Sequence, residues 1–501
     1  MNLHRIKDLS FQSTVIQFAG SALGVISTLF IYPLDLELYG VYGYLTNTAS
    51  LLVPFISIGF GAVLLRFYPQ YKNLSSAERY GFFGFILSGY GMGIILFTLL
   101  FLPGLHWFGN WIKPEGELET YIWFLWPFTV VLVLYEFTAQ LCINYSKIQW
   151  TAWAALLLKL ILPVVFLFTF WQILSRAWFI GGLCLYYLLV VSWIIWNFMN
   201  RDQLGFRWIP AMFNAERRNP LLKFAAFSVL SGASSVIALR MDSFFVGSLE
   251  GAEANGLFTL AMFMSNVVFI PATAITDALN PSVAKSSYTF NREELSDLYK
   301  KSSCNMLLGT VFMSVILWIS FEPLHWLMPH SDRINTIKTA LLFLLLARIM
   351  DAGTGVNHHI LSYSKQYRFE LYLLCGMAIM NVLLNLSLIP AMGISGAALA
   401  TLISIGVYNL LKTILVWFFL RIQPFTRSTW LILLTGVSIV AIFSIPISLS
   451  NHLIDLLAKS IGAASLYLAI MYWSKCSPEM NAFAESKRVK ILKYFKSTSL
   501  D

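Results

Sequence analysis

Charged side chains lie within long apolar stretches of this sequence, where an ionised group has little water to solvate it. They are Glu136, Lys159, Arg240, Asp242, Asp277, Arg348 and Asp351, with His358, His359 and Lys412 nearer the ends of such stretches. Ionisable residues are rare in apolar helices and commonly belong to pathways for ions or substrates. At about 1.5 Å of rise per residue, these charges are spread through the thickness of a bilayer, as a transport pathway requires.

Helical spacing places polar side chains on shared faces, because residues three or four apart lie on one side of a helix. The faces are Asn47, Ser50 and Ser57; Glu136, Gln140 and Asn144; Ser228, Ser231, Ser235 and Asp242; Asn266, Thr273, Asp277 and Asn280; and Arg348, Asp351, Gly355 and His358. Such faces do not contact lipid. We expect the charged residues to line a water-filled cavity. The polar residues expected beside it are Asn47, Gln140, Asn144, Asn266 and His358. Hydrogen bonding between packed helices is the simpler alternative for the serines and asparagines.

Two pairs of opposite charges have a definite structural alternative. Arg348 and Asp351 are three residues apart on one helix face, where they can neutralise each other. Arg240 and Asp242 are two residues apart and do not face each other, so each is expected to have a partner on another helix. Lys412 lies near the end of an apolar stretch, and we expect its side chain to extend to the membrane surface.

Signatures of other chemistry are absent from the sequence. It has no G-x-x-x-x-G-K-[ST] loop, no H-E-x-x-H motif and no paired C-x-x-C, so neither ATP hydrolysis nor a zinc site is indicated. His358 and His359 are adjacent and point about 100° apart on a helix, which disfavours a shared metal. None of the five cysteines lies in a predicted outer loop. We expect no cofactor, no metal, no disulfide framework and no enzymatic activity.

The elements that carry these residues are transmembrane helices. The chain has 501 residues, of which 58% are hydrophobic and only 12% charged, against about 25% charged in a soluble domain. A spanning helix needs roughly 20 apolar residues. Fourteen stretches qualify, at 11–33, 40–65, 81–102, 118–141, 151–175, 177–199, 221–247, 255–284, 303–321, 338–361, 369–390, 395–420, 429–449 and 453–473. The expected class is an all-α polytopic membrane protein.

The net charge of +9 reflects membrane topology and not nucleic-acid binding. With the N-terminus inside, only four of the 34 lysines and arginines fall in outer loops, five fall within spans, and the others lie on the inner side. Cytoplasmic loops carry such an excess of positive charge. Both termini are therefore predicted to be cytoplasmic.

The two halves of the chain repeat weakly at offsets of 214 to 218 residues. Glu37-Leu-Tyr-Gly40-Val-Tyr42 corresponds to Glu253-Ala-Asn-Gly256-Leu-Phe258, Tyr145-Ser-Lys147 to Tyr363-Ser-Lys365, and Gly182 to Gly396. Six spans is an even number, so both copies enter the membrane in the same orientation, and substrate is expected near their interface. The predicted domains are an N-terminal six-helix lobe at 1–200, a cytoplasmic linker at 201–220, a C-terminal six-helix lobe at 221–424, two additional helices at 425–475 and a basic cytoplasmic tail at 476–501.

Short passages along the chain resemble a transporter superfamily. They are Leu38-Tyr-Gly-Val-Tyr42, Leu239-Arg-Met-Asp-Ser-Phe-Phe-Val-Gly247, Asn255-Gly-Leu-Phe258 and Gly393-Ile-Ser-Gly-Ala-Ala398. With the architecture, they resemble the multidrug/oligosaccharidyl-lipid/polysaccharide superfamily, and within it the bacterial flippases of polyprenyl-linked O-antigen and capsule units. The resemblance covers nearly the whole chain. Its motifs are short and apolar, so they identify architecture better than substrate.

The resemblance implies a secondary transporter of the bacterial inner membrane. It would flip an undecaprenyl-diphosphate-linked oligosaccharide from the cytoplasmic to the periplasmic leaflet by alternating access, as an antiporter coupled to a proton or cation gradient. Arg240, Arg348 and Lys159 would then hold the diphosphate, and the coupling residues would be Glu136, Asp242, Asp277 and Asp351. The implied partners are the polyprenyl-diphosphate-linked glycan, membrane lipid and other polysaccharide assembly proteins.

Other functions stay open at this point. A cation-coupled multidrug extruder of the same superfamily often has an acidic residue in its first span, whereas 11–33 has none. The related flippases of peptidoglycan precursors are not separated by these motifs. A glycan polymerase or ligase embedded in the membrane usually has larger outer loops than this chain provides.

Overall fold

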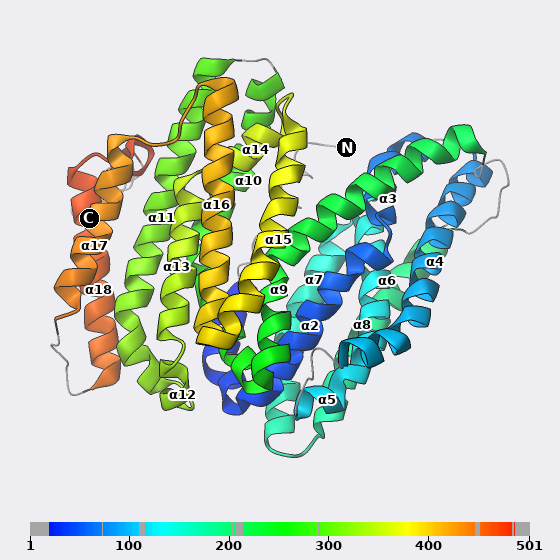
Figure 1. Ribbon diagram of the computed structural model, residues 1–501, viewed down its shortest axis with the longest axis horizontal. Helices are drawn as coiled ribbons and strands as arrows, with labels where there is room; N and C mark the ends of the chain where they lie inside the picture. The colour runs from blue at the N-terminus through cyan, green and yellow to red at the C-terminus, as the bar shows by residue number, and fades with distance from the viewer. Residues whose placement is uncertain are drawn as a thin grey trace, which may run out of the picture. The chain divides into compact units, whose positions relative to one another are not determined.

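The computed structural model of the chain describes residues 20–72, 74–109, 116–201, 205, 214–288, 291–445, 451–482 and 485. Every regular element in these ranges is a helix (Figure 1). Most of the predicted linker 201–220 and of the predicted tail 476–501 lies outside the described residues. The expected class, an all-α polytopic membrane protein, is confirmed.

Ten helices of the described chain are long and apolar enough to cross a membrane. Two of them are about twice the required length, Gly20–Ile56 with 37 residues and Glu216–Val268 with 53, because each holds two predicted spans. The predicted spans 338–361 and 429–449 form shorter helices, Lys338–Gly353 and Arg427–Phe443. Counted in this way, the helices agree with the predicted fourteen spans.

The helices have the following bounds. In the first half they are α2 Leu36–Ile56, α3 Phe60–Tyr71, α4 Ser76–Gly109, α5 Glu117–Tyr121, α6 Leu125–Asn144, α7 Ile148–Phe170 and α8 Arg176–Met199, with a short π-helix at Ser27–Ile31 and short 3₁₀ helices at Tyr32–Asp35 and Ile122–Phe124. In the second they are α9 Ala215–Val268, α10 Ile270–Tyr288, α11 Arg292–Leu327, α12 Ser331–Asn335, α13 Lys338–Gly353, α14 Asn357–Ser362, α15 Tyr367–Met392, α16 Ile394–Leu420, α17 Arg427–Phe443 and α18 His452–Trp473.

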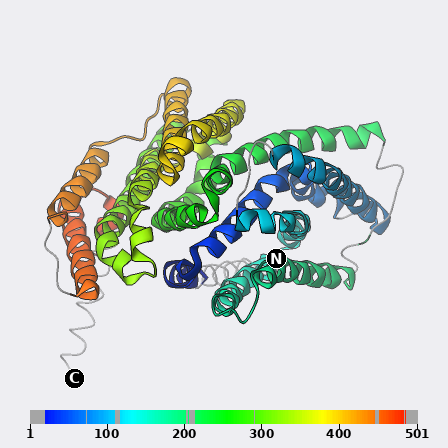
Figure 2. The same cartoon turned by 60° about the horizontal axis from the view of Figure 1, so that its bottom comes forward.

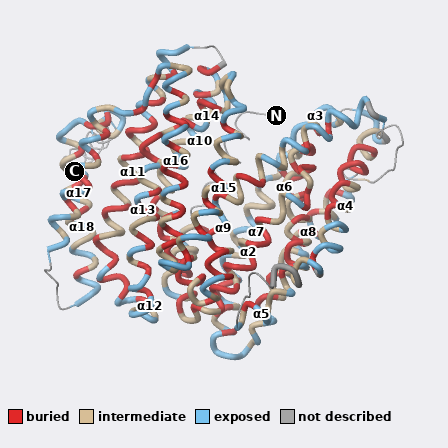
Figure 3. The backbone as a smooth tube through the Cα atoms, viewed as in Figure 1, coloured by how far each residue is buried: buried red, intermediate tan, exposed pale blue. Residues whose placement is uncertain are grey.

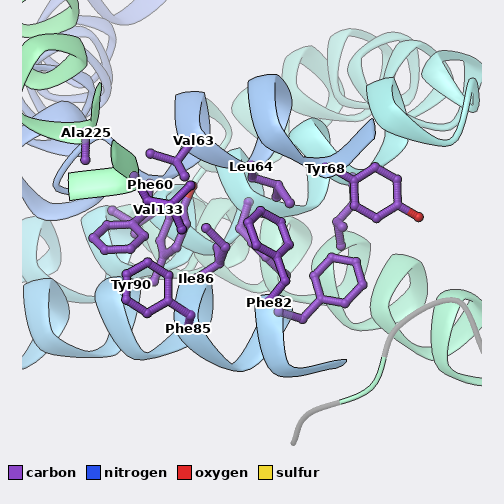
Figure 4. Packing of buried hydrophobic residues seen from close by; sticks show 14 of the residues in the cluster. Phe60, Val63, Leu64, Tyr68, Phe82, Phe85, Ile86, Tyr90, Val133 and Ala225 are labelled. Atoms are coloured by element: carbon purple, nitrogen blue, oxygen red, sulfur yellow. The ribbon is translucent and has the colours of Figure 1, made fainter. Parts of the chain in front are cut away.

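Helix α6 is the centre of the first of two compact units, which comprises Met1–Leu260 and Ala378–Ala397. It packs against α2, α3, α4, α7 and α8. Large apolar side chains fill the space between these helices, and Figure 4 shows Phe60, Phe85 and Val133 among them. Because lipid is as apolar as these side chains, close packing rather than exclusion of water holds the helices together.

Helix α11 has the central position in the second unit, which comprises Ala261–Met377 and Ala398–Asp501. It packs against α10, α13, α17 and α18. One core joins α11 to the C-terminal pair and includes Val311, Ile432 and Tyr467. The hydroxyl of Tyr467 donates to the carbonyl of Leu308 at 3.1 Å. The two helices beyond the repeat are therefore packed into the core of this unit. The lobe boundaries inferred from the repeat stay a prediction.

The duplicated motif packs against its own second copy within the first unit. A Cβ atom on Gly40 would collide with the backbone of Ala252, and a Cβ atom on Gly256 would collide with the carbonyl of Leu36. Only glycine permits this approach of α2 to α9. The Nδ2 group of Asn255 donates to the carbonyl of Gly40 at 2.8 Å. The repeated sequence therefore forms a close helix crossing.

The helices are interrupted at several places, both between and within the predicted spans. Helix α9, green in Figures 1 and 2, changes direction at Gly251, where φ is 89° and ψ is −179°, a conformation that favours glycine. The predicted span 40–65 is divided between α2 and α3, 255–284 between α9 and α10, and 338–361 between α13 and α14. Unwound turns free backbone polar groups, and at membrane depth these occur where protein or water surrounds them.

Outward faces of the peripheral helices are apolar. On α4, Ile95 and Leu99 are more than half exposed, and on α17 so are Leu434 and Val437. Figure 3 shows exposed residues running along these helices. A helix in water would carry polar residues there, so these faces contact lipid.

Candidate functional site

The carboxylate of Asp242 is buried among amide groups inside the first unit. Its side chain on α9 is 1% exposed and accepts hydrogen bonds from Nδ2 of Asn381 at 3.0 Å and of Asn385 at 2.6 Å. Both amides come from α15, so the predicted partner on another helix is confirmed. Nδ2 of Asn385 also donates to Oδ1 of Asn381 at 3.0 Å, and Oδ1 of Asn385 is buried without a donor. The cluster concentrates the oxygen ligands that hard cations prefer.

Arg240 lies two residues before Asp242 and faces a different helix, as predicted. One guanidinium N–H donates to Oδ1 of Asn47 on α2. Nδ2 of Asn47 donates to Ser243 at 3.1 Å, and the Ser243 hydroxyl donates to Oδ1 of Asn255 at 2.8 Å. No carboxylate of the described residues forms an ion pair with Arg240, whose side chain is exposed. An arginine in lipid is costly, which indicates that this exposed group faces water.

Arg348 is held in a similar way in the second unit. Its Nη2 donates to Oδ1 of Asn266 on α9, and its guanidinium carbon lies 5.2 Å from the centre of the Phe269 ring. Asp351 accepts a hydrogen bond from Nδ2 of Asn409 on α16 at 2.9 Å. Arg348 and Asp351 attract each other along α13, but the direct hydrogen bond of each goes to an asparagine of another helix.

A polar network beside Asp351 was not anticipated from the sequence. Glu370, on α15, is buried; it accepts from the Tyr408 hydroxyl at 2.5 Å and pairs with Nδ1 of His358 at 2.6 Å. Lys412 is only 3% exposed, and its ammonium lies 3.9 Å from the centre of the Tyr408 ring. Glu370 and Asp351 both attract this ammonium. The expectation that Lys412 extends to the membrane surface is therefore wrong.

A sequence signal for this network existed. Tyr408 and Lys412 are four residues apart and share a face of α16. Glu370 is the fourth residue of α15, in the first turn, where a carboxylate is favoured by the helix dipole without any further partner. His358, by contrast, was among the expected cavity residues, and its side chain is 53% exposed.

Glu136 lies on α6, in the first unit. The Tyr90 hydroxyl donates to its Oε2 at 3.2 Å, and no described cation pairs with it. Of the residues predicted to share its face, Asn144 donates to the backbone carbonyl of Leu64 at 3.1 Å, which joins two helices. Oε1 of Gln140 is buried without a donor. The face therefore combines one packing contact, one hydrogen-bonded carboxylate and one amide oxygen without a donor.

Lys159 and Asp277 are the remaining predicted charges. Lys159 is exposed on α7, where its side chain lies beside Gly20. Asp277 is exposed on α10 and lies near enough to His359 to attract it when that ring is protonated. Neither residue forms a side-chain hydrogen bond or an ion pair with another described residue.

Arg176 joins three segments of the first unit. Its guanidinium pairs with Asp35 at 2.9 Å, Glu37 at 3.0 Å and Glu117 at 2.9 Å. The side chain of Asp35 also accepts from the backbone N–H of Leu38 and so caps α2. Nothing in the sequence relates these partners, because Asp35 lies 141 residues from Arg176.

Comparison with known proteins gives one relative and a set of similar folds. No family model matches the sequence. An uncharacterized membrane protein of Methanocaldococcus jannaschii, MJ1375, is 24% identical over 200 residues. The matched stretch is 38% of this chain and spans less than half of that protein, 46% of its length.

Solved structures of a flippase and of two transporters are similar to this chain in fold. The lipid II flippase MurJ in an inward closed conformation matches with a TM-score of 0.70 at 16% identity, over 93% of this chain and 99% of that one. An inward-facing multidrug resistance MATE transporter matches with a TM-score of 0.61 at 14% identity, over 82% of this chain and 94% of that one. A MOP superfamily transporter from Pyrococcus furiosus matches with a TM-score of 0.53 at 13% identity, over 82% and 94%. The chain therefore has the fold that these structures share.

Proposed function

We propose that the chain is a secondary transporter that flips an undecaprenyl-diphosphate-linked oligosaccharide between leaflets, driven by a proton or cation gradient. One observation carries this proposal: Arg240 and Asp242 lie two residues apart on α9, and each is held by a different helix. An ion that binds at Asp242 changes the contacts of α9 with α15. The same short segment carries the cation that would hold the substrate, which provides a physical link between ion and substrate.

The cluster around Asp242 is the proposed coupling-ion site. Both amides donate through Nδ2 to Asp242, and rotation of these side chains would bring their oxygens beside the carboxylate as ligands for a hard cation. The buried Oδ1 of Asn385 has no donor, and leaving such an atom unpaired costs about 1–3 kcal/mol. A cation ligated there would satisfy this oxygen. Glu136, Asp277 and Asp351 stay in the proposal as further carboxylates that exchange protons during transport.

Arg240, Arg348 and Lys159 are the proposed ligands of the diphosphate. An arginine guanidinium binds phosphate oxygens through paired N–H groups. Asn47 and Asn266 orient the two guanidinium groups without neutralising them, because an amide oxygen carries no net charge. This leaves each arginine with positive charge available to a phosphate.

The similarity to MurJ supports a lipid-linked substrate, and the similarity to the MATE transporter supports the alternative, a cation-coupled multidrug extruder. A glycan polymerase or ligase has no such support, since these neighbours are a flippase and a transporter. The bacterial inner membrane and the cytoplasmic termini stay part of the proposal, which the charge distribution of the loops supports.

Deletion and complementation in the native organism test this function. We expect the deletion to abolish surface glycan and to accumulate lipid-linked oligosaccharide on the inner side. Arg240→Ala and Arg348→Ala should not restore surface glycan, whereas the exposed Lys223→Ala should. Normal amounts of each variant in the membrane are the control. Normal surface glycan with new sensitivity to cationic drugs would instead establish the extruder.

A further inference from the structure

Two cations of the first unit share one indole ring, away from the groups assigned above. Nζ of Lys147, in the turn between α6 and α7, lies 4.3 Å from the centre of the Trp150 ring. The guanidinium carbon of Arg201, just after α8, lies 5.8 Å from the same centre. Neither side chain forms a hydrogen bond or an ion pair with another described residue.

The site carries positive charge that no described carboxylate balances. Lys147 lies outside the spanning helices, and its pKa is lowered. Partial burial is the larger cause and the positive charge of Arg201 is the second. Two cations held on one ring repel each other, and an anion bound between them would remove this repulsion. The geometry therefore suits an anionic ligand, while the indole supports both cations through its π face.

Apolar surface continues from this site along two packed helices. The rings of Trp150 and Trp193 meet edge to face with centroids 5.0 Å apart, at the contact of α7 with α8. Exposed apolar residues follow at helical spacing, Trp153, Leu157 and Ile161 on α7 and Leu189 and Leu185 on α8. Such a surface suits hydrocarbon chains, which a free phosphate ion lacks.

We propose that Lys147, Trp150 and Arg201 bind the phosphate of an anionic membrane phospholipid, with its acyl chains on the exposed faces of α7 and α8. The charge distribution of the loops places this site at the cytoplasmic leaflet. Interfacial cations attract anionic lipids, and tryptophan is enriched at the same depth. The proposal does not depend on which substrate the protein transports.

Lipid binding to the purified full-length protein tests the proposal. Native mass spectrometry during titration with phosphatidylglycerol or phosphatidylcholine reports the lipids retained. For the double variant Lys147→Gln/Arg201→Gln, we expect roughly 30-fold weaker phosphatidylglycerol binding, since each cation near the surface contributes about a factor of five. Lys147→Arg/Arg201→Lys should bind normally because it keeps both charges.

The control removes two other exposed lysines of the same unit, as Lys72→Gln/Lys223→Gln, and we expect binding within about twofold of the parent. Equal losses in both double variants would show that general surface charge, and not this site, attracts the lipid. Equal binding of phosphatidylcholine, or displacement of phosphatidylglycerol by millimolar inorganic phosphate, would also overturn the proposal. Unchanged thermal unfolding of each variant excludes misfolding as the cause of a loss.

Discussion

Asparagine side chains position four of the charges within the helices, those of Arg240, Asp242, Arg348 and Asp351. Asn47 accepts from Arg240 in the first unit, and Asn266 accepts from Arg348 in the second. These asparagines lie on the second and eighth predicted spans, which have equivalent places in the two halves. An amide orients a charged group without cancelling it, so the charge stays available to a ligand.

The Asp242 cluster leads to a prediction about ion coupling. Asp242→Asn keeps the size of the side chain and removes its charge, so we expect normal insertion and loss of ion-dependent transport. Asn385→Ala removes one proposed oxygen ligand and should weaken cation affinity by at least about 10- to 100-fold, the range found when only the groups that orient metal ligands are lost. Transport measured against ion concentration in proteoliposomes checks both. Ser387→Ala on the same helix is the control, and wild-type ion dependence in Asp242→Asn would contradict this assignment.

The buried pair of Glu370 and Lys412 leads to a prediction about stability. Each single change, Glu370→Gln or Lys412→Met, removes one attraction from the other buried charge, which keeps only its second partner: Asp351 for Lys412, and His358 for Glu370. We expect the double variant to be more stable than the sum of the single effects predicts, by about 1 kcal/mol or more. Thermal unfolding of the four proteins in one detergent measures this coupling. Strict additivity would show that the two charges act independently.

Among the elements, close crossings and interruptions matter most. The crossing of α2 with the second part of α9 depends on glycine at both contact positions. It lies beside the hydrogen-bond chain from Arg240 through Asn47 and Ser243 to Asn255. Packing and polar contacts therefore hold the two helices together. A shift of one helix would change the hydrogen bond that orients Arg240.

Substitution of one crossing glycine tests this dependence. Gly40→Ala places a methyl group against the backbone of Ala252, and we expect it to destabilise the protein by about 1–3 kcal/mol. Gly182→Ala, on α8, meets open space and should be neutral or stabilising by up to about 1 kcal/mol. Thermal unfolding compares the two variants. A similar effect of both would mean that helix propensity, and not the crossing, determines the result.

The proposed topology of the whole molecule rests on where the chain places its positive charges. If both termini are cytoplasmic, the segment before α6 is outside and the turn before α4 is inside. With the five native cysteines replaced by serine, we expect Glu119→Cys to react with a membrane-impermeant maleimide in intact spheroplasts. Ser76→Cys should react only after lysis. The opposite labelling pattern would invert the proposed orientation.

Class and number of spans could be predicted from the sequence because both depend on local composition. Hydrocarbon requires that each segment satisfies its own backbone, so about twenty apolar residues in a row already specify a spanning helix. The spacing of Arg240 and Asp242 also predicted that they face different helices, since that property depends on helix geometry alone. The candidate charges were likewise visible as polar residues in apolar stretches.

Partners of those charges were decided only by the tertiary structure. Asp242 meets Asn381 across 139 residues, and nothing near Asp242 in sequence specifies which helix will lie there. Lys412 illustrates the same point, because its predicted location was wrong. Its position near the end of an apolar stretch suggested the membrane surface, but the packed helices bury it where Glu370 attracts it. Depth along one helix is a local property, whereas the neighbours of a side chain depend on how distant helices pack.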